Sequence, residues 1–261
     1  MIWLRSLLFI VLFQFLTALT CIALVPALIL PRRFLLAGVT FYLRVVAFVE
    51  KYLLGLTFEV RGREYMPKDG SYFVAAKHQS TYETLKLFYL FHDPAVILKK
   101  ELMRIPLWGW HAWKLDFIAI DRKNRESAMA SIIEGARHIK EQGRPIVIFP
   151  QGTRVRADQT PADKPYKGGI AKMYAATDLP ILPMAVNTGL FWPRGSIRKY
   201  PGKVIFEFLP PIEPGLPEKK VMQALEERIE NASIRLMHEG KRGNKYLEKT
   251  VIPPLPDTAA E

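Results

Sequence analysis

The pattern of apolar and polar positions divides the chain into two regions. In the first, the run from Ser6 to Pro31 carries no charge. About 20 apolar helical residues suffice to cross a hydrocarbon core of roughly 30 Å. A cleaved signal peptide would have a shorter apolar region, of roughly 7 to 15 residues, and a small-residue cleavage site. We therefore expect a membrane-associated helix that is kept in the mature protein.

A second apolar run, residues 34–56, differs because it contains Arg44, Glu50 and Lys51. This pattern indicates an amphipathic helix at the membrane interface at least as well as it indicates a second span. A buried core hairpin made of both runs is the alternative, although the first run is long for a helix inside a soluble core. Residues 1–56 are thus expected to anchor the chain to a membrane.

Basic residues are unevenly placed around the first run. Only Arg5 precedes it, whereas Arg32, Arg33, Arg44 and Lys51 follow it. Because positive charge near membrane helices tends to stay in the cytoplasm, we expect the bulk of the chain on the cytoplasmic side.

From about residue 57 the pattern changes to short apolar runs that alternate with helical periodicity. We expect strands at 57–62, 72–77, 115–120, 145–150, 180–186 and 203–209, and helices at 83–91, 126–142, 169–177 and 218–240. Such alternation predicts a single α/β domain over residues 57–240, with a mostly parallel central sheet flanked by helices. Residues 241–261 are expected to form a disordered tail.

Composition narrows the possible partners. Apolar residues make up 49% of the chain, which is ample for a core, and the net charge of +12 favours an anionic partner. Nucleic acid fits less well than lipid or a phosphorylated substrate, since no basic motif carries interspersed aromatic residues. Cys21 is the only cysteine. It excludes a disulfide framework and a thiolate zinc site, and no other motif indicates a metal, a cofactor, a serine hydrolase or a P-loop.

Three loops with polar residues each follow an expected strand. His78 follows 72–77, Asp121 and Arg122 follow 115–120, and the sequence from Gln151 to Arg154 follows 145–150. In open α/β sheets the ligand crevice lies outside the carboxyl ends of the strands. If these strands are parallel, one histidine and two arginines lie along the same edge.

The stretch HQSTYE, residues 78–83, could hold a catalytic pair. A turn through Gln79 and Ser80 could bring the Glu83 carboxylate to the His78 imidazole, fixing its tautomer and leaving the other ring nitrogen free to take a proton. Alternatively, Ser80 to Glu83 is a capping box, in which the glutamate only bonds the backbone at the start of its own helix. The two roles are compatible.

The stretch FPQGTR, residues 149–154, could bind an anion. Gly152 permits a tight turn, Thr153 offers a hydroxyl, and the planar fork of Arg154 suits a phosphate. Arg122 would add charge from the neighbouring loop. The alternative for each arginine is a solvated surface charge. Lys167 precedes two glycines at a helix start, where either an anion site or a plain glycine-rich turn is possible.

Four blocks in order, HQSTYE, FIAIDR, FPQGTR and LPILPMAVN, resemble those of the glycerolipid acyltransferases of the 1-acyl-sn-glycerol-3-phosphate type, over roughly residues 55–235. Glu83 stands where the family usually has Asp, and Gln151 where it usually has Glu. The first change keeps the charge and adds one methylene, whereas the second removes a charge. Both resemble a bacterial subset of the family, which implies the inner membrane as the location.

The resemblance implies roles for the residues singled out above. His78, held by Glu83, would be the general base on the hydroxyl of a lysophosphatidate, and acyl-CoA or acyl-carrier protein would be the donor. Arg154, Arg122, Gly152 and Thr153 would bind the phosphate, with Gln151 and Lys167 as further candidates. Pro183 would shape the acyl or thioester pocket. No covalent acyl-enzyme is implied.

Two other functions fit parts of the pattern. One is an acyltransferase of the same family that acts on another lysophospholipid or on a lyso-aminolipid. The other is a noncatalytic basic protein of anionic membrane surfaces, which accounts for the charge and the anchor but not for the order of His78, Gly152 and Arg154.

Overall fold

A seven-stranded sheet forms the centre of the chain, in the order β1-β7-β6-β2-β5-β3-β4. The computed structural model describes residues 1–121 and 125–256, without the side chains of 125–128. The strands are β1 Leu56–Arg61, β2 Phe73–Ala76, β3 Ala95–Lys99, β4 Ile118–Ile120, β5 Ile146–Ile148, β6 Ile181–Val186 and β7 Gly202–Phe208. The run from β6 to β4 is parallel, while β7 is antiparallel to β6 and parallel to β1. The expectation of a mostly parallel sheet is thus confirmed.

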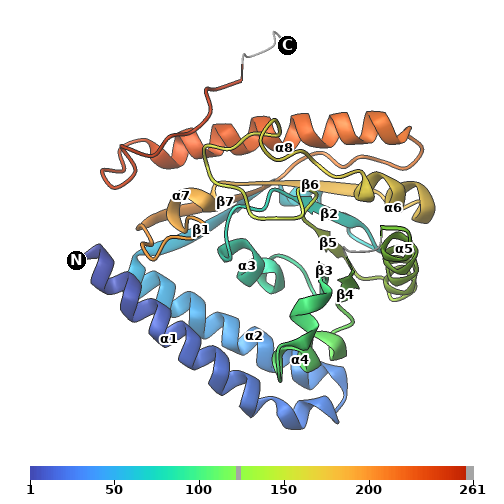
Figure 1. Ribbon diagram of the computed structural model, residues 1–261, viewed down its shortest axis with the longest axis horizontal. Helices are drawn as coiled ribbons and strands as arrows, with labels where there is room; N and C mark the ends of the chain where they lie inside the picture. The colour runs from blue at the N-terminus through green and yellow to red at the C-terminus, as the bar shows by residue number, and fades with distance from the viewer. Residues whose placement is uncertain (122–124, 257–261) are drawn as a thin grey trace.

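Helices cover both faces of this sheet (Figure 1). They are α1 Ile2–Ala23, α2 Arg32–Val49, α3 Tyr82–Leu90, α4 Trp108–Lys114, α5 Arg125–Glu141, α6 Gly169–Thr177, α7 Thr188–Phe191 and α8 Glu218–Lys241. Alternate strand residues face opposite ways. Val74 and Ala76 therefore join the apolar cluster on the side of α3, whereas Phe73 and Ala75 join the cluster under α5, α6 and α8.

Strand β3, helix α4 and the four-residue helix α7 were not expected from the sequence. Strand β3 is a short apolar run, AVILK, that is buried at its first four positions and shows no polar alternation. A run of this kind cannot be told from a piece of buried helix by periodicity. Helix α4 has only seven residues. Its pattern is too short to show a helical period.

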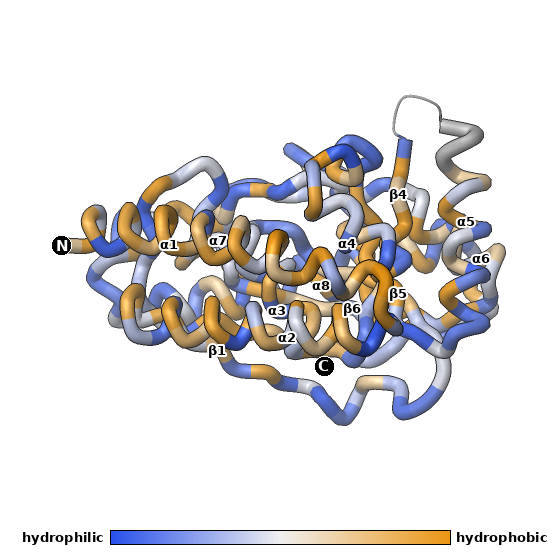
Figure 2. Tube along the Cα trace, turned by 90° about the horizontal axis from the view of Figure 1, so that it is seen from below, coloured by the Kyte–Doolittle hydropathy of each residue, from blue (hydrophilic) through white to orange (hydrophobic). Residues whose placement is uncertain are grey.

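Helices α1 and α2 lie side by side beneath the sheet and form an apolar surface on that side of the molecule (Figure 2). By length and composition alone, α1 is the one helix in the described part of the chain that could cross a membrane. Its buried residues are few, Ser6 and Phe9. Large apolar side chains point outward along it, among them Trp3, Leu4, Leu8, Val11, Phe15, Leu19 and Ile22.

Both ends of α1 nevertheless contact the α/β domain. Near its start, the backbone N–H of Lys199 donates to Ser6 Oγ at 2.9 Å, and the Phe9 ring packs edge-on against Trp192 at 5.2 Å. Beyond its end, Ala27 packs with Leu115 of the domain. The helix is therefore held along the surface of the domain and does not project from it.

Helices α1 and α2 together form a helical hairpin. Charged residues fix α2, its second helix. Arg32, at the start of α2, pairs with Asp93 at 2.7 Å and with Asp116 at 2.5 Å. After α2, the buried carboxylate of Glu50 pairs with the buried ammonium of Lys86 on α3. The second apolar run is thus a helix to Val49 followed by one π-helical turn, Glu50–Leu54, before β1 begins.

The segment after α8 departs from the expectation of disorder, as far as residue 256. Leu247 is fully buried, and the Asn244 side chain donates to the Pro201 carbonyl at 3.0 Å. Further along, His238 Nε2 lies 2.8 Å from the Pro253 carbonyl oxygen. The segment therefore contacts the domain at Asn244, Leu247 and Pro253, and Leu247 joins its apolar cluster.

Candidate active site

His78 lies just beyond the carboxyl end of β2, between its neighbours β5 and β6. The chain leaves the strand at Ala76 and enters α3 at Tyr82. This turn places His78 Nδ1 2.8 Å from Glu83 Oε1. A carboxylate oxygen only accepts hydrogen bonds, so Nδ1 carries the hydrogen and the lone pair of the neutral ring is on Nε2. The histidine and the glutamate are therefore brought together although they are five positions apart.

Glu83 also closes the start of its helix. The same oxygen, Oε1, accepts the backbone N–H groups of Gln79 and Ser80, both at 2.7 Å. The side chain is fully buried, and its other oxygen has no hydrogen-bond partner among the described residues. The cap and the histidine partner are thus the same atom. Both contacts expected from the sequence are thus present, and the second oxygen takes part in neither.

The His78 ring is held from one face by an aromatic residue. Phe149, at the end of β5, stacks on it with ring centroids 4.2 Å apart. The His78 carbonyl also accepts the Val155 N–H at 2.7 Å, which ties this turn to the loop after β5. The imidazole keeps 18% of its surface exposed, and Nε2 has no partner among the described residues. The ring is thus fixed in orientation with its basic nitrogen available.

Arg154 is in the loop after β5, and its side chain reaches the start of α3. Its Nη1 donates to Thr81 Oγ1 at 2.8 Å, and its carbonyl accepts from the guanidinium of Arg194. Gly152 has a φ of 66° and closes a turn onto the Phe149 carbonyl at 2.8 Å. A Cβ at this position would approach Lys167 Nζ to 3.1 Å. The loop after β5 therefore directs Arg154 to Thr81 at the start of α3 and holds Lys167 next to Gly152.

Other expected site residues are placed differently. Gln151 is 2% exposed, and its Oε1 has no partner in the described part of the chain, so this side chain points inward. Thr153 is partly exposed in the same loop. Pro183 is buried within β6 opposite Ala75 and is not at the edge of the sheet. Arg122 lies outside the described residues.

A largely apolar cavity of about 360 Å³ opens next to this loop. Thr81, the hydroxyl partner of Arg154, is one of its lining residues, and the others come from the hairpin, from α3, from β3, and from α4 and the segments on either side of it. They include Phe13, Cys21, Tyr42, Phe88, His111 and Phe117. Pro183 is not among them.

Sequence reasoning missed Thr81, Phe149, Arg194 and the cavity residues. Thr81 and Phe149 lie inside the two stretches that were singled out, so their proximity to His78 and Arg154 was a detectable signal. The cavity depends on how the hairpin packs on α4, which no local pattern encodes. No cluster of His, Cys, Asp or Glu among the described residues could hold a metal.

Residues 57–187 match the sequence profile of the family described as Acyltransferase. The chain belongs to this family. The matched segment contains the His78–Glu83 pair and the loop from Gln151 to Arg154. The geometry above is therefore that of a family member, and the noncatalytic interpretation of the basic charge does not account for this match.

Curated relatives carry a more specific name. The chain is 35% identical over 161 residues to a 1-acyl-sn-glycerol-3-phosphate acyltransferase of Pseudomonas aeruginosa, a match that covers 62% of this chain and 61% of the relative. It is 33% identical over 165 residues to the enzyme of that name from Escherichia coli, covering 62% and 64%. The chain thus spans less than two thirds of the length of these two relatives.

The fold is also that of a solved structure. The crystal structure titled as the 1-acyl-sn-glycerophosphate acyltransferase PlsC from Thermotoga maritima matches with a TM-score of 0.74 and 24% identity. The match covers 90% of this chain and 98% of that one. Most of the chain therefore follows the fold of that structure.

Substitutions at Glu83 should separate its two roles. In Glu83→Ala the N–H groups of Gln79 and Ser80 stay buried without acceptors, at about 1–3 kcal/mol each, so we expect a loss of about 2–6 kcal/mol in the free energy of unfolding. Glu83→Gln keeps an acceptor oxygen and should lose about 1 kcal/mol or less. Urea unfolding of the purified protein measures both, and equal losses in the two variants would contradict the capping role.

Proposed function

We propose that the chain transfers a fatty acyl group from acyl-CoA or acyl-carrier protein to the sn-2 hydroxyl of 1-acyl-glycerol-3-phosphate, which gives phosphatidic acid. The observation that carries this proposal is the buried contact of Glu83 Oε1 with His78 Nδ1, beside a loop that presents Arg154 and Lys167. A base and an anion-binding loop at one edge fit an acceptor that has both a hydroxyl and a phosphate. The names of the curated relatives support the same acceptor.

His78 Nε2 would act as the general base. It removes the proton of the acceptor hydroxyl as the oxygen attacks the thioester carbonyl, and Glu83 stabilises the imidazolium that forms. The tetrahedral intermediate then collapses, the carbon–sulfur bond breaks, and the proton passes from Nε2 to the leaving thiolate. A new ester and a free thiol result, so the step needs no metal, no redox partner and no covalent acyl-enzyme.

Arg154 would bind the phosphate of the acceptor. Its guanidinium uses Nη1 on Thr81 and keeps further N–H groups for a ligand, and a planar fork suits phosphate oxygens. Lys167 would add a second positive charge beside the Gly152 turn. Arg122 remains a candidate in the same role, and Gln151, being buried, would support the loop and not touch the phosphate.

The cavity would take a hydrocarbon chain. It is lined mostly by apolar side chains, and one of its lining residues is Thr81, which bonds Arg154 of the proposed phosphate site. Its walls come from the hairpin that carries the outward apolar surface, so a chain could pass between membrane and site without crossing water. This arrangement would let a membrane lipid present its headgroup to His78.

The hairpin would lie in one leaflet of the cytoplasmic membrane, with the α/β domain on the cytoplasmic side. Contacts from both ends of α1 to that domain favour this over a span, because a spanning helix would have to leave the domain surface. Lys51 and Arg33, which flank apolar and aromatic residues at the two ends of α2, suit anionic headgroups.

Replacing the base should nearly abolish transfer. In His78→Ala we expect the turnover of lysophosphatidate with labelled acyl donor to fall by about 10²- to 10⁴-fold, because general-base catalysis is lost. His92→Ala, at an exposed histidine, is the matched control and should keep full activity. The variant should bind membranes as the unmodified protein does, so that a loss of transfer reports on the base. Substantial transfer by purified His78→Ala protein would overturn the assignment.

Replacing the phosphate ligand should act mainly on acceptor binding. Arg154→Ala loses a charged hydrogen bond of about 1.5–3 kcal/mol, so we expect the KM for lysophosphatidate to rise about ten- to hundredfold with a smaller effect on kcat. Arg156→Ala removes an exposed arginine two positions away and should leave this KM unchanged. Acylation of monoacylglycerol, which has no phosphate, should be unaffected by Arg154→Ala. An unchanged KM for lysophosphatidate would tell against the role.

Chemical labelling can test the position of the hairpin. An Ile2→Cys variant, with Cys21→Ser to remove the native thiol, should react with a membrane-impermeant maleimide only from the side on which Lys203→Cys reacts, since both would lie on the domain side. Sealed vesicles of both orientations allow the comparison. Labelling of the two positions from opposite sides would show that α1 spans the membrane.

A further inference from the structure

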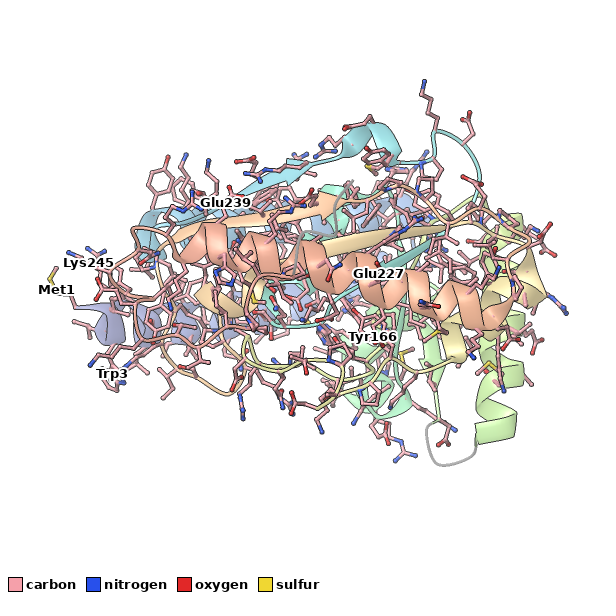
Figure 3. All side chains as sticks on the ribbon, turned by 90° about the horizontal axis from the view of Figure 1, so that it is seen from above. Met1, Trp3, Tyr166, Glu227, Glu239 and Lys245 are labelled. Atoms are coloured by element: carbon pink, nitrogen blue, oxygen red, sulfur yellow. The ribbon has the colours of Figure 1, made fainter. Side chains whose placement is uncertain are left out.

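A single carboxylate on α8 connects the two loops of the candidate site. Lys77 Nζ donates to Glu230 Oε2 at 2.6 Å, and Tyr166 Oη donates to Glu230 Oε1 at 3.0 Å. All three side chains are buried, and Lys77 has no exposed surface. In Figure 3, Tyr166 lies along α8, in agreement with its hydrogen bond to Glu230 on that helix. Each oxygen of Glu230 thus has one partner from a different loop.

Each partner of Glu230 is the sequence neighbour of a residue that is proposed to act in the reaction. Lys77 directly precedes His78, and Tyr166 directly precedes Lys167. The Lys167 N–H also donates to the Pro150 carbonyl at 3.0 Å, and its ammonium lies next to Gly152. The base and the anion-binding loop are therefore both fastened to Glu230, each through the residue before it.

The triad of Lys77, Tyr166 and Glu230 is better suited to fixing the positions of the two loops than to stabilising the fold. A buried ion pair gains little over apolar residues of the same shape, because desolvation offsets the attraction, while loss of one partner is costly. Burial and the neighbouring Glu230 carboxylate raise the pKa of the Tyr166 hydroxyl well above its usual value, so this hydroxyl stays a proton donor. Both bonds to Glu230 have defined directions, unlike an apolar contact.

We propose that Glu230 is a positioning residue, which through Lys77 and Tyr166 sets the separation between His78 and the phosphate-binding loop. The inference rests on the function proposed above for the reaction that it positions. Glu230 itself touches neither substrate nor reacting atoms. Breaking the Tyr166 arm should loosen the anion loop, whereas breaking the Lys77 arm should shift the base.

Tyr166→Phe tests the first arm with the smallest change. It removes one hydrogen bond and leaves the Lys77–Glu230 pair in place, so the KM for lysophosphatidate should rise about three- to tenfold while kcat stays within about twofold. Tyr174→Phe is the matched control, because the Tyr174 hydroxyl is hydrogen-bonded to Leu216 N at 3.0 Å and lies on α6, away from Glu230. An unchanged KM in Tyr166→Phe, or an equal rise in Tyr174→Phe, would overturn the proposal.

Paired substitutions test the whole triad, because Glu230 is also the acceptor of the Tyr166 hydroxyl. Lys77→Met with Glu230→Met removes both charges and should lower kcat at least tenfold. Lys86→Met with Glu50→Met removes an equally buried pair beside the hairpin and should change stability without that loss of kcat. Equal losses of kcat in the two double variants would reduce the triad to a structural role. If the first double variant does not fold, Tyr166→Phe decides alone.

Binding of glycerol 3-phosphate separates this inference from the proposed function. Calorimetric titration needs no acyl transfer, and the affinity should fall about three- to tenfold in Tyr166→Phe but not in Tyr174→Phe. If the unmodified protein does not acylate lysophosphatidate but shows this difference in affinity, the proposed acceptor is wrong and the positioning role stands. Equal affinities in all three proteins would refute the positioning role.

Discussion

The parallel pairing of β2 with β5 is the constraint on which the rest of the site depends. Its register sets Phe73 opposite Ile146 and Ala75 opposite Ile148, so both strands end at the same edge of the sheet. His78 follows one strand and the loop from Gln151 to Arg154 follows the other. Backbone hydrogen bonds thus bring base and anion loop together before any side chain of the site contributes. The contacts of Phe149 with the His78 ring and of Val155 with the His78 carbonyl refine a proximity that the sheet has already established.

Most of the sheet and the pairing of His78 with Glu83 could be predicted from the sequence, because each rests on a local signal. Strand order could not be read in the same way. The reversal of β1 and β7 relative to the other strands and the insertion of β3 depend on contacts between distant segments. Glu83 shows a different limit. The sequence could not choose between cap and histidine partner because both roles use the same geometry, and in the structure a single oxygen serves both.

Residues that complete the site through long-range packing were out of reach of sequence patterns. Thr81 is unremarkable in the sequence until Arg154 is seen to donate to it. In the sequence Arg32 is a charge that flanks a membrane helix, yet in the structure its guanidinium forms ion pairs with Asp93 and Asp116 of the domain. The cavity likewise exists only because the hairpin and α4 pack together. In each case the residue type was visible in the sequence and its partner was not.

The Lys77–Glu230 pair also limits how this sequence can drift. Neither residue can be replaced alone without leaving a charge in a site from which water is excluded, a loss of several kcal/mol. A route through two simultaneous changes, or through a neutral pair of matching volume, would be open but narrow. The residue before the histidine and a residue on the last long helix, far apart in the chain, are therefore expected to tolerate substitution only together. Substitutions on the outer surface of the hairpin should be tolerated far more readily than single substitutions at these two positions.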